Sequence, residues 1–86
     1  MNTDIELKEN IPMDLSKLPL GKKCRVTELT SNGSIRRRML DLGVIKDTEI
    51  EALTKSPSGD PVAYLIRGAV IAIRKEDAAN IYIESV

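Results

Sequence analysis

The densest cluster of functional groups in the sequence is the arginine triplet Arg36-Arg37-Arg38. A guanidinium group offers parallel N–H donors, which suit bidentate pairing with a carboxylate or a phosphate. Lys22 and Lys23 add positive charge nearby in the sequence. The triplet therefore predicts a patch that binds an acidic partner surface or an anionic membrane face. The alternative is a solvated helix face, because three consecutive helical residues cannot all contact one partner equally.

Further candidate contact residues lie in the second half of the chain. Arg67 and Arg74 bring positive charge to the rim of the predicted fold, where neighbouring carboxylates could equally neutralise it. Gly59 and Asp60 belong to Ser56–Pro61, a run of turn-forming residues. A rigid loop of this kind can present residues to a partner. Turn geometry alone explains the same residues, and we favour that interpretation.

The residue types predict no catalytic, cofactor or metal site. The sequence contains no histidine, which excludes histidine-based acid–base and triad chemistry. The single cysteine, Cys24, cannot form a disulfide within one chain or build a zinc or iron–sulfur site alone. We expect Cys24 to be a small buried hydrophobe, with a redox or ligand role as the alternative. The carboxylates Asp60, Glu76 and Asp77 match no calcium loop, and oxygen ligands alone select Fe²⁺ poorly.

Length and composition indicate one small domain without a dominant electrostatic field. The chain has 86 residues, and its 13 Lys+Arg balance 13 Asp+Glu. Zero net charge argues against nucleic-acid binding. Tyr64 and Tyr82 are the only aromatic residues, which argues against stacking platforms and grooves for proline-rich peptides. We expect a soluble cytosolic protein, because the sequence shows no signal-peptide pattern and no apolar run long enough to span a bilayer.

The chain is predicted to divide into an arm and a folded domain. Residues 1–13 carry isolated apolar positions without a sustained pattern, so we expect a loose arm followed by a domain over 14–86. Met13–Leu18 predicts a single helical turn that Pro19 stops. Leu20 is expected to face the core together with the leucines of this turn.

A helix is predicted over Ile35–Leu42, after a first strand over Cys24–Leu29 that alternates apolar and polar residues. Ser34 can cap the first turn of this helix through its hydroxyl group. Gly43 can supply the left-handed residue that ends it. The apolar residues that recur at helical spacing, and are expected to be buried together, are Ile35, Met39, Leu40 and Leu42.

The rest of the sequence is typical of short strands joined by turns. Apolar runs predict strands over residues 48–55, 62–67, 69–74 and 81–84, with a helical turn over 75–80. Gly68 indicates a tight turn between the third and fourth strands, and Ser56–Pro61 indicates a hairpin tip. Five short strands with regular turns predict a small closed antiparallel barrel, which hides its strand edges.

The order of the motifs is more specific than any single one. The helix segment Ile35–Gly43 is followed along the chain by Thr48–Glu51, Pro57, Gly59-Asp60-Pro61, Arg67-Gly68, Ile71–Arg74 and Asp77–Ile81. This ordered series, which spans residues 15 to 84, resembles the FeoA family, the small ferrous iron transport protein A.

The resemblance implies a mainly β, five-stranded SH3-like barrel with a helix after the first strand and a helical turn before the last. It also implies a non-enzymatic cytosolic regulator without a cofactor. Its partner would be FeoB, a membrane-embedded ferrous transporter with a cytosolic GTP-binding domain. An arginine-finger role of the triplet toward that GTPase is the less favoured possibility. Two alternatives stay open, namely a nucleic-acid-binding small barrel and self-association through strand edges or the N-terminal arm.

Overall fold

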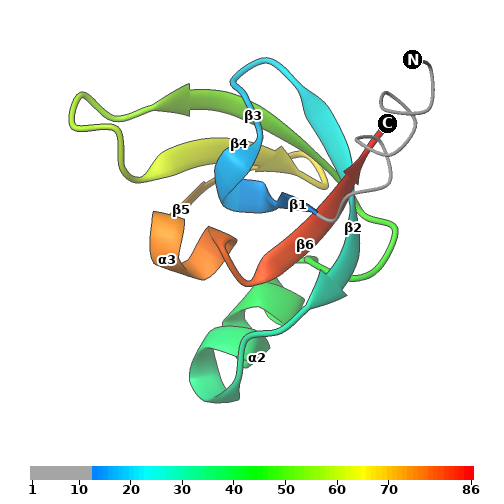
Figure 1. The fold of residues 1–86 in the computed structure, drawn as a ribbon. Helices are drawn as coiled ribbons and strands as arrows, with labels where there is room; N and C mark the ends of the chain where they lie inside the picture. The colour runs from blue at the N-terminus through cyan, green and yellow to red at the C-terminus, as the bar shows by residue number, and fades with distance from the viewer. Residues whose placement is uncertain (1–12) are drawn as a thin grey trace.

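The computed structural model describes residues 13–86, which form six antiparallel strands, two α-helices and one 3-10 turn (Figure 1). In chain order these elements are β1 (Met13–Asp14), the 3-10 turn η1 (Leu15–Lys17), β2 (Lys23–Leu29), α2 (Gly33–Asp41), β3 (Glu49–Lys55), β4 (Val62–Ile66), β5 (Ala69–Ile73), α3 (Lys75–Ala78) and β6 (Ile81–Ser85). The mainly β class is confirmed. The predicted arm lies outside the described residues, except for Met13, which belongs to β1.

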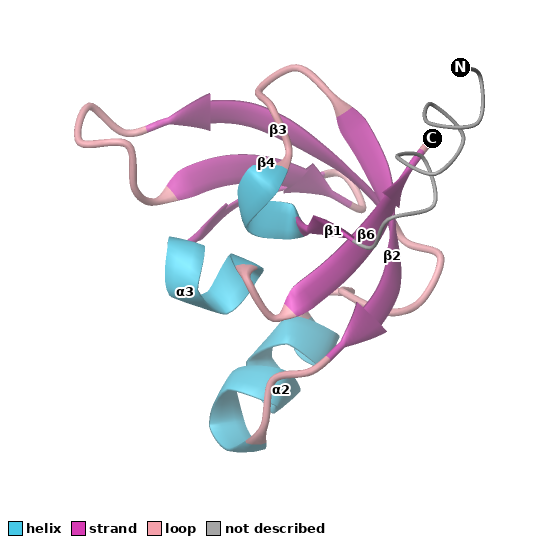
Figure 2. Cartoon of the chain, in the orientation of Figure 1, coloured by secondary structure: helices cyan, strands magenta, loops and turns pink. Residues whose placement is uncertain are grey.

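All six strands belong to one sheet with the order β1-β6-β2-β3-β4-β5 (Figure 2). Strand β1, which has two residues and is too short to show a period of two, adds to the five strands predicted. The pairing of β2 and of β3 shifts register once along each strand, and such bulges bend a strand and help the sheet to curl. Within residues 13–86, no pairing joins β1 to β5, so the ladder stays open where a closed barrel was expected.

The hydrophobic core lies inside this curl. Cys24 and Val26 of β2 point inward, as their alternation predicts. The expectation for Leu20 is wrong, because this side chain is 44% exposed. The chain is already extended at Leu18, so Leu20 does not share a helical face with Leu15. The buried hydrophobic residues are Leu15, Leu18, Cys24, Val26, Met39, Val44, Ile50, Ala52, Tyr64, Ile66, Ile73, Ala78, Ile81 and Ile83.

Helix α2 projects from the sheet instead of packing a broad face against it (Figure 1). Met39 is its only buried residue, whereas Ile35 is 36% exposed and Leu40 is 41% exposed. The predicted burial of Ile35 and Leu40 is therefore wrong, because helical spacing identifies a shared face without showing what covers it. Ser34 is not the N-cap either, since the helix begins at Gly33 and Asn32 precedes it without a side-chain cap.

Gly43 ends α2 in the left-handed conformation, as predicted, with φ +95°. Its N–H donates to the carbonyl of Leu40, and the N–H of Val44 donates to the carbonyl of Met39, each at 3.0 Å. These two bonds form a Schellman cap, which satisfies carbonyl groups that the helix end leaves free. The side chain of Arg67 lies against Gly43, so that a Cβ atom at this glycine would overlap Arg67 Cδ.

We expect Gly43→Ala to lower the free energy of unfolding by about 1–3 kcal/mol, because alanine is strained at this φ and its methyl group displaces Arg67. Urea denaturation measures the change. Gly59→Ala is the matched control, because Gly59 has φ +94° but open space around its Cβ position. The Gly59 variant should lose less stability than the Gly43 variant. Equal losses would show that the Arg67 contact contributes nothing.

Candidate groove between the hairpin tip and α3

The structure distributes the seven predicted contact residues over three places. Arg38, Arg74, Gly59 and Asp60 gather where the β3–β4 hairpin tip meets the start of α3. Arg36 and Arg37 line a different hollow along α2, and Arg67 lies on the β4–β5 turn. The arginine triplet is therefore not one patch, because consecutive residues of a helix point in different directions.

Arg38 and Arg74 converge on a hollow of about 150 Å³, which we call the arginine hollow. Arg38 comes from α2, whereas Arg74 follows β5 and precedes α3. Both arginines are exposed, and neither has an ion-pair partner among residues 13–86. The hollow is lined by Arg38, Met39, Pro61, Ala72, Ile73, Arg74 and Asp77. Two guanidinium groups beside apolar side chains form a site suited to a carboxylate on an apolar segment.

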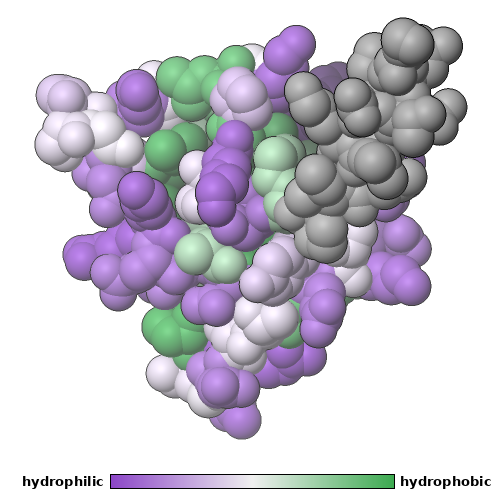
Figure 3. Space-filling view, viewed as in Figure 1, coloured by the Kyte–Doolittle hydropathy of each residue, from purple (hydrophilic) through white to green (hydrophobic). Residues whose placement is uncertain are grey.

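A second hollow of about 250 Å³, which we call the lysine hollow, lies between the hairpin tip, the η1–β2 connection and the start of α3. Val62 and the partly exposed Leu20 contribute apolar surface to it, and the buried residues Leu18, Tyr64 and Ile73 lie beneath. Charged lining residues are Lys55, Lys75 and Asp60. Figure 3 shows hydrophobic surface among hydrophilic residues on the face where η1 and α3 lie.

The two hollows adjoin and together form what we call the two-hollow groove. Ile73 lines both of them. Asp60 and Lys75 border the lysine hollow, while their chain neighbours Pro61 and Arg74 border the arginine hollow. The groove therefore runs across two short segments, 60–61 and 73–75, that lie side by side.

Asp60 holds these two segments together. Its Oδ1 accepts a hydrogen bond of 2.8 Å from the backbone N–H of Lys75, at the first residue of α3. Its backbone carbonyl accepts hydrogen bonds from Ser56 Oγ at 2.7 Å and Ser58 Oγ at 3.0 Å. The hairpin tip therefore has the turn geometry that we favoured, and it also forms a wall of the groove. A contact between a partner and Gly59 or Asp60 stays a prediction.

Arg36 makes structural contacts within the chain. Its Nη1 donates to the carbonyl of Leu29 at 2.7 Å and to that of Ser31 at 3.5 Å. These bonds tie α2 to the end of β2. Arg37 is exposed beside Leu40 and Asp41, and a contact between Arg37 and a partner stays a prediction.

Arg67 lies apart from the two-hollow groove. With φ +50° it forms a two-residue turn with Gly68, φ +83°, as a hairpin turn with two left-handed residues requires. It borders a separate hollow of about 320 Å³ that also contains Glu49 and Glu51. These two carboxylates lie near Arg67, as the sequence suggested. Arg67 is therefore a weaker candidate for binding an acidic partner.

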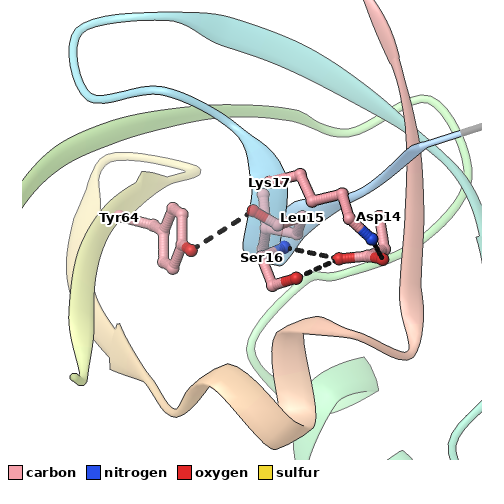
Figure 4. Close-up of polar contacts among 5 residues, drawn as sticks. All are labelled: Asp14, Leu15, Ser16, Lys17 and Tyr64. Carbon is pink, nitrogen blue, oxygen red and sulfur yellow. Dashed lines mark hydrogen bonds and ion pairs between the residues drawn. The ribbon is translucent and has the colours of Figure 1, made fainter. Parts of the chain in front are cut away.

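Cys24 and Tyr64 are ionisable residues buried in the core. Cys24 is fully buried, as predicted, and desolvation raises the pKa of its thiol to about 11, so it is protonated at neutral pH. Burial also raises the pKa of Tyr64 to about 12. Figure 4 shows the Tyr64 hydroxyl pointing toward Leu15, to whose carbonyl it donates at 3.4 Å.

A polar cluster beside Tyr64 secures η1. The carboxylate of Asp14 accepts hydrogen bonds from the N–H of Ser16 at 2.9 Å and from Ser16 Oγ (Figure 4). Lys17 Nζ lies 3.3 Å from the same carboxylate. These hydrogen bonds and the Lys17 charge lower the pKa of Asp14, although desolvation, the largest single influence, raises it. The cluster therefore caps η1.

Residues 13–86 contain no group of three or more His, Cys, Asp or Glu side chains arranged to hold a metal ion. None of the helices in the same range is long and apolar enough to cross a membrane.

The sequence model of the FeoA domain matches residues 13–85. The chain belongs to the FeoA family. The Fe(2+) transport protein A/Fe(2+) transporter FeoB fusion protein of Porphyromonas gingivalis is 33% identical over 72 residues. That match covers 84% of this FeoA chain but 8% of the fusion protein.

Solved FeoA structures share the fold. The FeoA protein of Chlorobium tepidum is 30% identical, with a TM-score of 0.81, and the match covers 86% of this chain and 70% of that one. The FeoA of Stenotrophomonas maltophilia, solved with zinc and described as an SH3 domain protein, is 29% identical with a TM-score of 0.76. The match covers 84% of this chain and 89% of the Stenotrophomonas maltophilia protein. The SH3-like fold is therefore confirmed.

Sequence reasoning missed three residues of the groove. Leu20, Lys55 and Lys75 were not among the predicted contact residues. These residues come from β3, from the start of α3 and from the η1–β2 connection, so no motif links them. Lys55, the basic residue directly before the turn segment Ser56–Pro61, was the only available signal.

Proposed function

We propose that this FeoA chain is a non-enzymatic adaptor that binds FeoB on its cytosolic side and tunes its assembly or its GTPase cycle. The fusion protein of Porphyromonas gingivalis carries this proposal, because it joins a FeoA domain and a FeoB transporter in one polypeptide. Covalent linkage raises the effective concentration of one domain near the other, which favours their contact. Such a contact requires a surface of the FeoA domain that binds the transporter.

The lack of histidine and of a reactive cysteine supports a binding role over catalysis. The protein has no histidine, and the thiol of its one cysteine is buried and protonated at neutral pH. A nucleophile requires an adjacent base or a lowered pKa, and Cys24 has neither a histidine partner nor a lowered pKa. By contrast, the two-hollow groove offers cationic groups that form no ion pair within residues 13–86, beside apolar surface, which suits recognition of another protein.

The proposal predicts that a tagged copy of this chain retains FeoB from detergent-solubilised membranes of its own organism. The retained proteins are identified by mass spectrometry and compared with those retained by the tag alone. GTP hydrolysis by the purified transporter, with and without the chain, then tests for regulation. No enrichment of FeoB from membranes shown to contain it would refute the adaptor role.

A further inference from the structure

We propose that the two-hollow groove binds an extended, acidic segment of the transporter's soluble part. Apolar side chains of that segment enter the two hollows, and its carboxylates pair with the arginine and lysine side chains around them. This inference deepens the proposed function and rests on it. It places the contact at the hairpin tip and the start of α3, away from the outer face of α2.

The size of the hollows favours single side chains as their occupants. Their volumes of about 150 and 250 Å³ are below the range of roughly 300–1,000 Å³ that is typical of small-molecule sites. Because chain neighbours line the two hollows, Asp60 beside Pro61 and Arg74 beside Lys75, their mouths lie close enough for one extended segment to reach both. The apolar surface that Leu20 exposes at the edge would be covered by such a segment.

Charge determines the kind of segment that fits. Arg38 and Arg74 line one hollow, and Lys55 and Lys75 line the other, against one acidic residue in each. The acid of the lysine hollow, Asp60, already accepts the Lys75 N–H. The groove is thus locally cationic in a chain with zero net charge. Acidic partners complement it, and the planar arginine groups can bind carboxylates in bidentate fashion.

Two other classes of ligand fit less well. Recognition of proline-rich peptides requires exposed aromatic side chains in the groove, but Tyr64, its only aromatic residue, is 2% exposed. Single-stranded nucleic acid is usually bound by stacking on aromatic side chains, which the groove also does not present. An acidic peptide segment uses both the cations and the apolar surface.

The test compares three double charge reversals by their affinity for the purified full-length transporter in detergent. Arg38→Glu/Arg74→Glu and Lys55→Glu/Lys75→Glu alter the two hollows. Lys22→Glu/Lys46→Glu is the control, because it changes the net charge equally at exposed residues outside the groove. We expect each groove variant to bind at least tenfold more weakly and the control to stay within twofold of the unaltered chain. Circular dichroism confirms that each variant is folded.

A further variant tests the apolar part of the interface. Leu20→Ser removes an exposed side chain at the edge of the lysine hollow without altering the core or the net charge. We expect severalfold weaker binding to the same transporter. A purely electrostatic contact would leave the affinity of this variant unchanged and would overturn the two-hollow arrangement.

The remaining outcomes separate the inference from the proposed function. If the unaltered chain binds and all three double variants weaken equally, general charge attraction explains binding and the groove assignment fails. If none weakens, the contact lies elsewhere, with the Arg37 face of α2 as the next candidate. In both cases the adaptor role survives. If the unaltered chain does not bind the transporter, the adaptor role and the inference fail together.

Discussion

Replacing Tyr64 by alanine is expected to lower the free energy of unfolding by about 3–5 kcal/mol, as for other large aromatic residues in cores. Tyr64 is among the largest fully buried side chains, and it packs inside the curl with Leu15, Ile66 and Ile73. A domain of this length has a total stability of roughly 4–13 kcal/mol. The expected loss is therefore between about a quarter of this total and all of it.

Urea denaturation followed by circular dichroism measures this loss. Tyr64→Phe is the matched control, because it keeps the ring and removes only the hydroxyl group that donates to Leu15 at 3.4 Å. A hydrogen bond contributes about 1 kcal/mol, so Tyr64→Phe should lose far less stability than Tyr64→Ala. If both variants lost the same amount, the hydrogen bond and not the packed ring would be the main contribution.

The second large effect is a loss of stability at alkaline pH. Burial raises the pKa of Cys24 from 9.0 to about 11 and that of Tyr64 from 10.0 to about 12. The unfolded chain therefore releases these protons at lower pH than the folded protein does. We expect the contribution of these two groups to the free energy of unfolding to be present below about pH 9 and to be lost as the pH rises toward 12. A shift of two pKa units corresponds to about 3 kcal/mol for each group.

Denaturation curves at pH 7 to 11 test this dependence. Tyr64→Phe removes the ionisable phenol while keeping the ring in the core, so its stability should decline less steeply above pH 10 than that of the unaltered chain. Tyr82→Phe is the control, because Tyr82 is only half-buried on β6. An identical decline in the unaltered chain and in the Tyr64→Phe variant would show that the Tyr64 phenol does not contribute.

Local sequence patterns predicted most elements of the fold. The alternation around Cys24 and the turn residues Gly43 and Gly68 depend on the backbone and on near neighbours. The strands β2 to β6 therefore lie within about two residues of their predicted bounds. The ordered motifs also predicted the FeoA family, which the match over residues 13–85 confirms.

Structural features that depend on residues distant in the sequence were predicted less well. Helical spacing placed Ile35, Met39, Leu40 and Leu42 on one face. Met39 is buried and Leu42 packs partly buried against the core, but Ile35 and Leu40 stay exposed because α2 projects from the sheet. Whether the edge strands β1 and β5 pair and close the sheet likewise depends on how far the sheet curls. Neither the orientation of a helix nor the curvature of a sheet is encoded in a short window of sequence.

The sequence by itself determined the chemistry that this protein has available. Without histidine, and with one cysteine and balanced charges, it offers recognition by arginine, lysine and apolar side chains. Only the tertiary structure decided where that recognition can occur. Arg38 and Arg74 are 36 positions apart and meet because β5 returns the chain to α2, while Arg36 and Arg37 turn away from them. Sheet pairing and core burial bring residues that are distant in the sequence together, whereas the helical twist points adjacent residues in different directions.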